Sequence, residues 1–334
     1  MGISIIIPNY SDYKNLIKCV SKINNQDFNK SKIEVIIAEG NKNYKKIKKN
    51  YKFKIKQKYL GFPKNQEARK YSAIKICRFN ILCFLDTDNF LINKDFLKIH
   101  YKAMREKYVS FSYCKYYSYK NVKGWLNKYY SAIGGNDPIS YFFNKNDRLP
   151  YNENFITNDN YKIESKLDNY SIYKFNKLDK TIGANGFFVK KKIYNKLKEF
   201  KPESFLHIDT NISLLNKLEK KKFALIDAEL AHESSSGILK NLFKRVSYFD
   251  EFYFKIYKKR KFKIIDFSKF LDVLKLIFLV LSSLTIIYPI IFSIFKLIKT
   301  KKLAWIYHII LINLFILTYA YISLKLYIKK LCNV

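Results

Sequence analysis

Two aspartates, Asp86 and Asp88, follow the apolar run ILCFL and are separated by a single residue. Carboxylates are costly to bury, so their place directly after a hydrophobic run calls for an explanation. Two carboxylates with this spacing can both reach a hard divalent cation, and carboxylate and phosphate oxygens suit Mg²⁺ or Mn²⁺. The alternative is that the sequence DTDN caps a following helix, because Asp and Asn favour N-caps and turns.

Short apolar runs alternate with amphipathic stretches over the first ninety residues. The runs are typical of strands buried on both faces, and the stretches place apolar residues on one helical face. They predict the order strand, helix, strand, strand, helix, strand, at residues 3–10, 12–23, 33–40, 52–60, 65–78 and 80–88. This order predicts an α/β layer with a largely parallel sheet. Residues 100–180 are less regular, and order returns with a helix at 209–221 and a strand at 223–230.

Polar residues follow four of the predicted strands. In a parallel α/β sheet, ligands bind outside the carboxyl ends of the strands. The polar groups expected at such ends are Asn9 with Tyr10, Glu39, Asp86 with Asp88, and His232. Separate strands would thus bring acidic groups to one edge of the sheet.

The composition indicates a partner with negative charge. The chain has 334 residues, and 63 Lys and Arg stand against 27 Asp and Glu, which gives a net charge of +36. So basic a protein favours nucleic acid, anionic lipid or phosphorylated substrates, although AT-biased coding would also enrich Lys, Asn, Ile and Tyr. The five cysteines include no CxxC pair, which argues against a disulfide framework or zinc ribbon and favours reduced thiols in the cytoplasm. The N-terminal apolar run breaks at Pro8 and predicts a strand rather than a signal peptide.

Two long stretches near the C-terminus, 276–295 and 303–324, carry no Asp, Glu, Lys or Arg. Each is long enough for a helix to cross a hydrocarbon core of roughly 30 Å. We therefore predict two transmembrane helices within 276–324, preceded by a basic amphipathic membrane-proximal segment at 246–275 and followed by a basic tail at 325–334. The segment 255–275 and the tail hold 11 basic residues against four lysines in the connection, which favours an N-terminal domain and a tail on the cytoplasmic side of the inner (plasma) membrane. The four connecting lysines keep a re-entrant hairpin open as an alternative.

An ordered set of motifs resembles the family 2 glycosyltransferases. The motifs are SIIIPNY, IEVIIAEG, GFPKNQEARKYSA, ILCFLDTDN, TIGANGFFVKK and HIDTNI, and the resemblance covers residues 3–245. It implies the GT-A fold, a mostly parallel sheet flanked by helices, in a catalytic domain at 1–245. It also implies a nucleotide-diphosphate sugar as the donor.

The resemblance assigns residues to the nucleotide end of the donor site. Pro8 and Tyr10 belong to the nucleotide-binding start, with Tyr10 against the base. Glu39 matches an acidic residue that bonds the base, where the family more often has Asp. Arg69 would face the nucleotide or its diphosphate, and Lys70 stands where the family usually has Asn.

The DTD motif corresponds to the family's metal motif. Asp88 would bind the Mn²⁺ or Mg²⁺ that bridges the diphosphate, and Asp86 would support the ribose, the sugar or the metal shell. His232 is either a further metal ligand or a polar residue at a strand end.

The acceptor side is implied by two later motifs. Gly183, Asn185 and Gly186 resemble a GGNG-like strand beside the acceptor, or serve a plain turn. Asp209 keeps the Asp of the family's catalytic Glu-Asp pair, with Ile208 in place of the Glu, and would deprotonate the acceptor hydroxyl. A helix N-cap is the other reading of Asp209, and the two are compatible.

The function implied is an inverting, metal-dependent hexosyl transfer to a lipid-linked saccharide in cell-surface polysaccharide or glycolipid synthesis. One alternative is transfer of a sugar directly to polyprenyl phosphate. Another, of a different class, is a membrane-tethered basic protein that binds polyanions. Under the preferred interpretation we expect a membrane partner and no nucleic acid, and the oligomeric state stays open.

Overall fold

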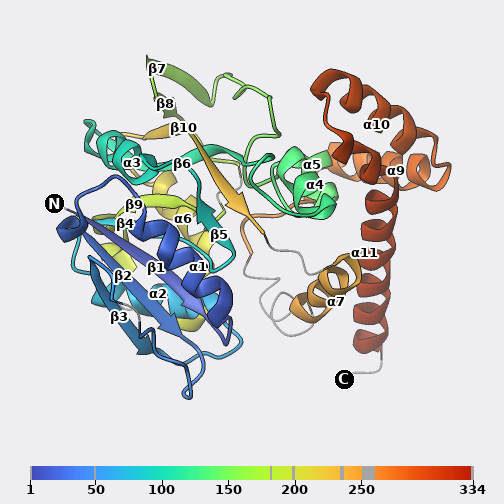
Figure 1. Ribbon diagram of the computed structural model, residues 1–334. Coiled ribbons are helices and arrows are strands. Elements are labelled where there is room, and N and C mark those ends of the chain that lie inside the picture. Colours follow the sequence, from blue (N-terminus) through green and yellow to red (C-terminus); the bar gives the residue numbers. More distant parts are fainter. Residues whose placement is uncertain are drawn as a thin grey trace. The chain divides into compact units, whose positions relative to one another are not determined.

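The computed structural model describes residues 2–48, 50–180, 183–197, 200–233, 237–249 and 260–331 (Figure 1). The chain divides into an α/β unit, Met1–Asn121 with Asn154–His232, and a helical unit, Val122–Glu153 with Glu233–Val334. In this division Val122–Glu153 and the chain after His232 group with the C-terminal helices, whereas the sequence predicts a catalytic domain over 1–245. Parts of the predicted basic segment and tail, 250–259 and 332–334, lie outside the described residues.

Ten strands form one sheet in the α/β unit, in the order β3-β2-β1-β4-β9-β6-β10-β8-β7, with β5 paired to β10 (Figure 1). The strands are β1 (Ile3–Asn9), β2 (Ile33–Glu39), β3 (Lys54–Tyr59), β4 (Ile81–Phe84), β5 (Asn89–Leu91), β6 (Val109–Tyr117), β7 (Tyr161–Leu167), β8 (Tyr170–Phe175), β9 (Phe187–Lys190) and β10 (Lys222–His232). Strands β1 to β4 run parallel, as do β6 and β10, while β5, β7, β8 and β9 pair antiparallel. The predicted α/β architecture is confirmed, and the sheet is mixed rather than largely parallel.

Helices flank this sheet (Figure 1). They are α1 (Tyr13–Asn24), α2 (Gln66–Ile76), α3 (Phe96–Arg105) and α6 (His207–Asn216), with 3₁₀ turns η1 (Lys30–Lys32), η2 (Lys191–Leu197) and η3 (Pro202–Ser204). Helix α1 begins where the Asp12 side chain accepts from Asn15 N, and it buries Leu16, Val20 and Ile23 at helical spacing. The predicted helices at 12–23, 65–78 and 209–221 are confirmed, with shifts of a few residues at their ends.

The helical unit has its own apolar core. Its elements are α4 (Trp125–Ile133), α5 (Pro138–Phe142), α7 (Ile238–Tyr248), α9 (Phe270–Leu284), α10 (Ile287–Thr300), η6 (Leu303–Tyr307) and α11 (His308–Leu331). Side chains of α5, α7, α9 and α11 meet in one buried cluster, which includes Ile139, Leu242, Leu279 and Phe315. The Val122–Glu153 segment is thus packed with helices that begin 85 or more residues after its end.

The apolar C-terminal stretches differ from each other in the structure. Among the described residues, Leu303–Ile328 is the one straight segment long and apolar enough to cross a membrane. The other stretch, predicted as one continuous helix over 276–295, is instead broken into α9 and α10, which meet at 94°. Ile286 lies at the break in the left-handed region, with φ 60°.

Candidate active site

The strand topology brings the predicted site residues to one edge of the sheet. Strands β1, β2 and β4 are parallel, and β9 runs antiparallel to both β4 and β6, so β6 and β10 point the same way as β4. Asn9, Glu39 and His232 are the last residues of β1, β2 and β10, and Asp86 follows β4 by two residues. Gly186, directly before the antiparallel β9, lies at the same edge.

A buried carboxylate lies at the end of β2. Glu39 accepts hydrogen bonds from Asn9 Nδ2 (3.1 and 2.9 Å) and from Gln57 Nε2 (2.7 Å). Burial raises the pKa of Glu39, while these two amides and the nearby Arg69 act in the opposite direction. Tyr10, directly after β1, keeps 53% of its surface exposed, whereas Pro8 is buried in the sheet. Of the two predicted residues at the nucleotide-binding start, Tyr10 is therefore the one with side-chain surface for a ligand.

Arg69 lies against a glycine that sequence reasoning did not single out. A Cβ on Gly40 would lie 2.6 Å from Arg69 Nη1 and 3.1 Å from Tyr10 Cδ2, so any side chain at Gly40 would displace both. Arg69 is 4% exposed, and its guanidinium donates to the carbonyl oxygens of Phe62 and Pro63. Burial lowers the pKa of Arg69, against the effect of Glu39 and Asp86. Arg69 therefore has a fixed position beside Tyr10 and close to Glu39.

A buried lysine separates the environments of the two aspartates. Lys70 is 1% exposed, and its Nζ lies 3.3 Å from Asp86 Oδ1 and 3.1 Å from Glu67 Oε1. Burial alone would lower the pKa of Lys70, but Asp86 and Glu67 together raise it above its usual value. The carboxylate of Asp86 is therefore engaged by an ammonium group. Lys70 appeared in the sequence only as a departure from the family pattern.

Asp88 faces His232 because of a short strand that the sequence did not reveal. Strand β5 begins directly after Asp88 and pairs antiparallel with the end of β10, with Asn89 opposite His232. His232 Nε2 lies 3.6 Å from Asp88 Oδ2. Asn89 Nδ2 donates to Asp88 Oδ1 (2.7 Å) and to Asn185 Oδ1 (3.0 Å). Thus Asp88, His232 and Asn185, predicted separately, belong to one connected group.

Gly186, directly before β9, has a backbone conformation and a close neighbour that both disfavour a side chain at this position. Gly186 has φ +65°, and a Cβ there would lie 3.1 Å from Leu230 Cδ2. Its N–H donates to Phe84 O at 2.8 Å, which joins the turn to the end of β4. Gly183, three residues earlier, is buried. The turn therefore fixes the position of Asn185 at the edge of the sheet.

Asp209 lies in the first turn of α6 and is 7% exposed. The helix begins at His207, with Leu206 at the N-cap, so the predicted N-cap role of Asp209 is wrong. The start of α6 is held by a hydrogen bond from His207 N to Glu67 Oε2 (2.7 Å), and the His207 ring packs edge-on against Phe84 (5.0 Å). Glu67 thus joins the beginning of α6 to Lys70 and, through it, to Asp86. A carboxylate in a first helical turn is favoured by the helix dipole.

The described residues provide two side-chain donors for a divalent cation. They contain no group of three His, Cys, Asp or Glu side chains that could hold a metal ion. Asp88 and His232 face each other, and Asp86 is engaged by Lys70. Mg²⁺ in phosphate-transfer sites is commonly held by one or two carboxylates, with waters and substrate phosphates completing the shell. The donor set therefore fits a metal that binds together with a diphosphate.

The family model described as Glycosyl transferase family 2 matches residues 4–168. Over this range, which is just under half of the chain, the sequence matches a family 2 glycosyltransferase domain. The matched range contains Tyr10, Glu39, Arg69, Asp86 and Asp88. The later site residues, Asn185, Asp209 and His232, lie beyond it.

The solved structures that match the chain include TarS and a mannosyltransferase. TarS 1-349 of S. aureus, in complex with UDP-GlcNAc, is 14% identical with a TM-score of 0.45, covering 71% of this chain and 60% of that one. The mannosyltransferase PcManGT from Pyrobaculum calidifontis, in complex with GDP-Man and Mn²⁺, is 10% identical with a TM-score of 0.46, covering 78% and 65%. The match therefore spans less than two thirds of the length of each of these two proteins. No curated protein matches the chain.

Proposed function

We propose that the enzyme transfers a hexose, with inversion, from a nucleotide-diphosphate sugar to a lipid-linked saccharide at the cytoplasmic face of the inner (plasma) membrane. The observation that carries the proposal is the group at the sheet edge, in which Asp88, His232 and Asn185 are joined through Asn89. It lies at the carboxyl ends of the strands of a family 2 domain, where ligands of α/β sheets bind.

In this proposal the nucleotide lies over the ends of β1 and β2. Tyr10 offers an exposed ring for the base, and Glu39 at the end of β2 would accept a hydrogen bond from it. Arg69 supplies positive charge beside them. Asp88 and His232 would hold Mn²⁺ or Mg²⁺ at the diphosphate, and the bound cation would neutralise charge on the departing nucleoside diphosphate. Asp86, fixed by Lys70, would accept hydrogen bonds from the ribose or the sugar rather than ligate the metal.

The acceptor hydroxyl would enter on the side of Asn185 and Asp209. Asp209 would take its proton as the oxygen attacks the anomeric carbon, and a single displacement of this kind inverts the configuration. The contact between His207 and Glu67 supports this assignment, because it ties the first turn of α6 to the network around Asp86.

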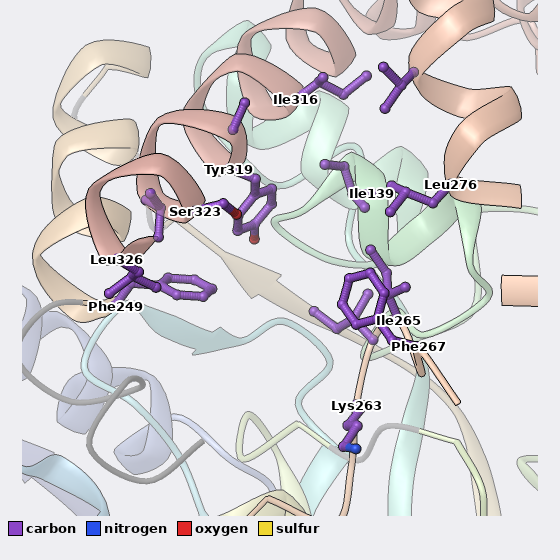
Figure 2. Close-up of a pocket in the computed structure, with 14 residues that line it drawn as sticks. Ile139, Phe249, Lys263, Ile265, Phe267, Leu276, Ile316, Tyr319, Ser323 and Leu326 are labelled. Atoms are coloured by element: carbon purple, nitrogen blue, oxygen red, sulfur yellow. The ribbon is translucent and has the colours of Figure 1, made fainter. Parts of the chain in front are cut away.

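The helical unit supports a lipid-linked acceptor. It contains a cavity of about 500 Å³ whose described lining includes side chains of α5, α9 and α11 (Figure 2). Its walls are largely apolar, with Ile139, Leu276 and Ile316 among them, and Lys263 is the charged residue of the described lining. Such walls suit a hydrocarbon chain, and Lys263 suits the phosphate that joins the chain to a saccharide.

The proposal is tested with Asp88→Asn and Asp209→Asn in membranes containing the full chain. A panel of nucleotide sugars is screened for metal-dependent release of nucleoside diphosphate. Asp88→Asn should lose most metal-dependent turnover, and Asp209→Asn should lose about 10²–10⁴-fold in transfer rate while still binding donor. Asp159→Asn, at an aspartate outside the site, is the matched control. Full activity of the Asp88 variant would remove the metal assignment, and full activity of the Asp209 variant would remove the base.

Transfer to polyprenyl phosphate is the second candidate, because the same apolar cavity with Lys263 fits a prenyl chain and its phosphate. Paired assays with polyprenyl phosphate and with a lipid-linked saccharide separate the two acceptors. The polyanion-binding alternative gives no role to a match with an enzyme family over residues 4–168 and is set aside.

A further inference from the structure

The helical unit exposes far more apolar surface than a domain surrounded by water. Large hydrophobic side chains are exposed along α9, α10 and α11, for example Phe270 (74%), Ile298 (71%) and Leu317 (62%). Contiguous apolar surfaces of this extent mark protein or membrane contacts. Lysines flank the apolar helices at both ends of the α10–α11 connection and in the C-terminal tail. Basic groups beside an apolar surface complement anionic headgroups, so the occupant we assign is a lipid leaflet.

Neither α9 nor α10 is long enough to cross this lipid alone. They have 15 and 14 residues, about 22 and 21 Å of helix, against a hydrocarbon core of roughly 30 Å. The 94° bend between them prevents the pair from acting as one straight span. The side of the membrane on which α10 ends therefore has to be inferred from the contacts of its C-terminal end.

The end of α10 and the start of α11 are held by the Val122–Glu153 segment. Lys296 Nζ, on α10, lies 2.5 Å from Glu153 Oε1. The Trp125 ring stacks on Tyr307 at 4.2 Å between centroids, and Tyr129 OH lies 2.7 Å from His308 Nδ1. One ion pair, one ring stack and one hydrogen bond thus join the α10–α11 connection to this segment.

The side of the membrane on which Val122–Glu153 lies is fixed by chain continuity. The segment leaves the α/β unit shortly after β6 and returns to it shortly before β7. Its helices, α4 and α5, have nine and five residues, and its connections carry charged residues such as Lys123, Lys145 and Arg148. It cannot cross a bilayer and return, so it lies on the same side as the α/β unit.

The contacts of the middle of α11 also place it on the same side of the membrane as Val122–Glu153. Arg245 Nη1, on α7, lies 2.8 Å from Asp137 Oδ2, and Tyr319 of α11 donates to that carboxylate. Tyr319 lies 11 residues after the start of α11, about 17 Å along the helix. If α11 crossed the membrane, this ion pair would lie near the bilayer centre, where charged groups are most costly.

We propose that the helical unit binds a single leaflet from the side of the α/β unit. The proposal rests on the proposed membrane location and not on the sugar chemistry. Helices α9 and α10 enter and leave the same leaflet, and α11 lies along its surface. The α10–α11 connection and the C-terminal tail both stay on the catalytic side. The four lysines of the connection then lie on the same side as the other basic residues, which removes their conflict with the positive-inside rule.

The experiment is cysteine accessibility in intact and permeabilised cells with a membrane-impermeant maleimide. The four described cysteines are buried, so the native Cys332 reports on the tail. Lys299→Cys in a Cys332→Ser background reports on the connection, and Lys162→Cys on exposed β7, in the same background, is the α/β control. All three thiols should be protected in intact cells and should react after permeabilisation.

Three outcomes overturn the proposal. Labelling of Lys299→Cys in intact cells, with Lys162→Cys protected, would show a spanning hairpin. Labelling of Cys332 alone would show that α11 crosses the membrane. A Lys299→Cys thiol that reacts in neither condition would lie within the bilayer. Recovery of the protein in the soluble fraction would instead refute the membrane location itself, and loss of sugar transfer would leave the labelling pattern unchanged.

Discussion

At the scale of single residues, the two aspartates of DTD have different partners. Asp86 is paired with the buried Lys70, and Asp88 faces His232. Spacing alone treats the two carboxylates as equivalent. What distinguishes them is Lys70 on α2, 16 residues before Asp86, and His232 at the end of β10. No local pattern contains this information, because it depends on which elements pack at the sheet edge.

We expect Lys70→Met to destabilise the α/β unit, because it leaves the carboxylates of Asp86 and Glu67 without their ammonium. Removal of one partner of a buried ion pair costs roughly 3–5 kcal/mol, and the 23% exposure of Asp86 places this case toward the lower end. Denaturant unfolding measures the loss. Lys70→Met combined with Asp86→Asn should be more stable than Lys70→Met alone. A double variant no better than the single one would contradict the coupling.

The stability lost in Lys70→Met should also depend on pH. Lys70 is among the groups that lower the pKa of Glu67, so the stabilisation from ionised Glu67 is present above its unfolded pKa of about 4.3 and is lost as the pH falls through the lower native value. The stability difference between wild type and Lys70→Met should therefore narrow as the pH falls from about 5 to about 3. An unchanged difference over this range would show that the lost stability is not electrostatic.

At the scale of elements, the apolar runs and helical faces of the first ninety residues predict β1 to β4, α1 and α2 within a few residues. Strands β1, β2 and β4 are buried along their whole length, so their sequences are largely apolar runs, whereas the edge strand β3 is partly exposed and alternates. Strand β5 is too short to have a pattern, with three residues. The hairpin β7–β8 and helices α4 and α5 lie in a stretch rich in Tyr, Lys and Asn, where the chain gives no clear period. Their burial depends on partners distant in sequence.

Gly186→Ala should weaken the junction between β4 and β9 for two reasons. A positive φ costs an L-residue roughly 1–2 kcal/mol, and the added Cβ would also crowd Leu230. Gly61→Ala is the matched control, because Gly61 has φ +77° and nothing within 4 Å of the added Cβ. Thermal unfolding of both variants should show a larger loss for Gly186→Ala. Equal losses would mean that the crowding is relieved at no cost.

At the scale of the whole molecule, the sequence predicts a division at residue 245, but the structural division follows packing instead. The composition locates the apolar C-terminal stretches correctly. The composition does not indicate that Val122–Glu153 packs with these stretches. Nothing in the sequence distinguishes Trp125 and Tyr129 from the other aromatic residues of this tyrosine-rich region. Their partners, His308 and Tyr307, lie in a different part of the sequence.

Truncation after His232 should therefore give an aggregating protein, even though it keeps every residue proposed for the donor site and the base Asp209. The helices α4 and α5 would lose η6 and α11, which cover them in the full chain. Replacement of residues 122–153 by a Gly-Ser linker in the same truncation should restore a monodisperse protein, because long loops cost little to close. Size-exclusion chromatography compares the two. A monodisperse simple truncation would show that α4 and α5 do not need their partners.

The division of the helical unit between two parts of the chain also determines the order of its assembly during synthesis. Val122–Glu153 leaves the ribosome before residues 154–237, and its packing partners are made only at the end of the chain. At ribosomal rates of about 5–20 residues per second, α4 and α5 wait several seconds or longer for them. During this interval their apolar faces need a temporary cover. A bilayer surface or a chaperone at the ribosome exit would therefore act on this enzyme while most of its α/β unit is already complete.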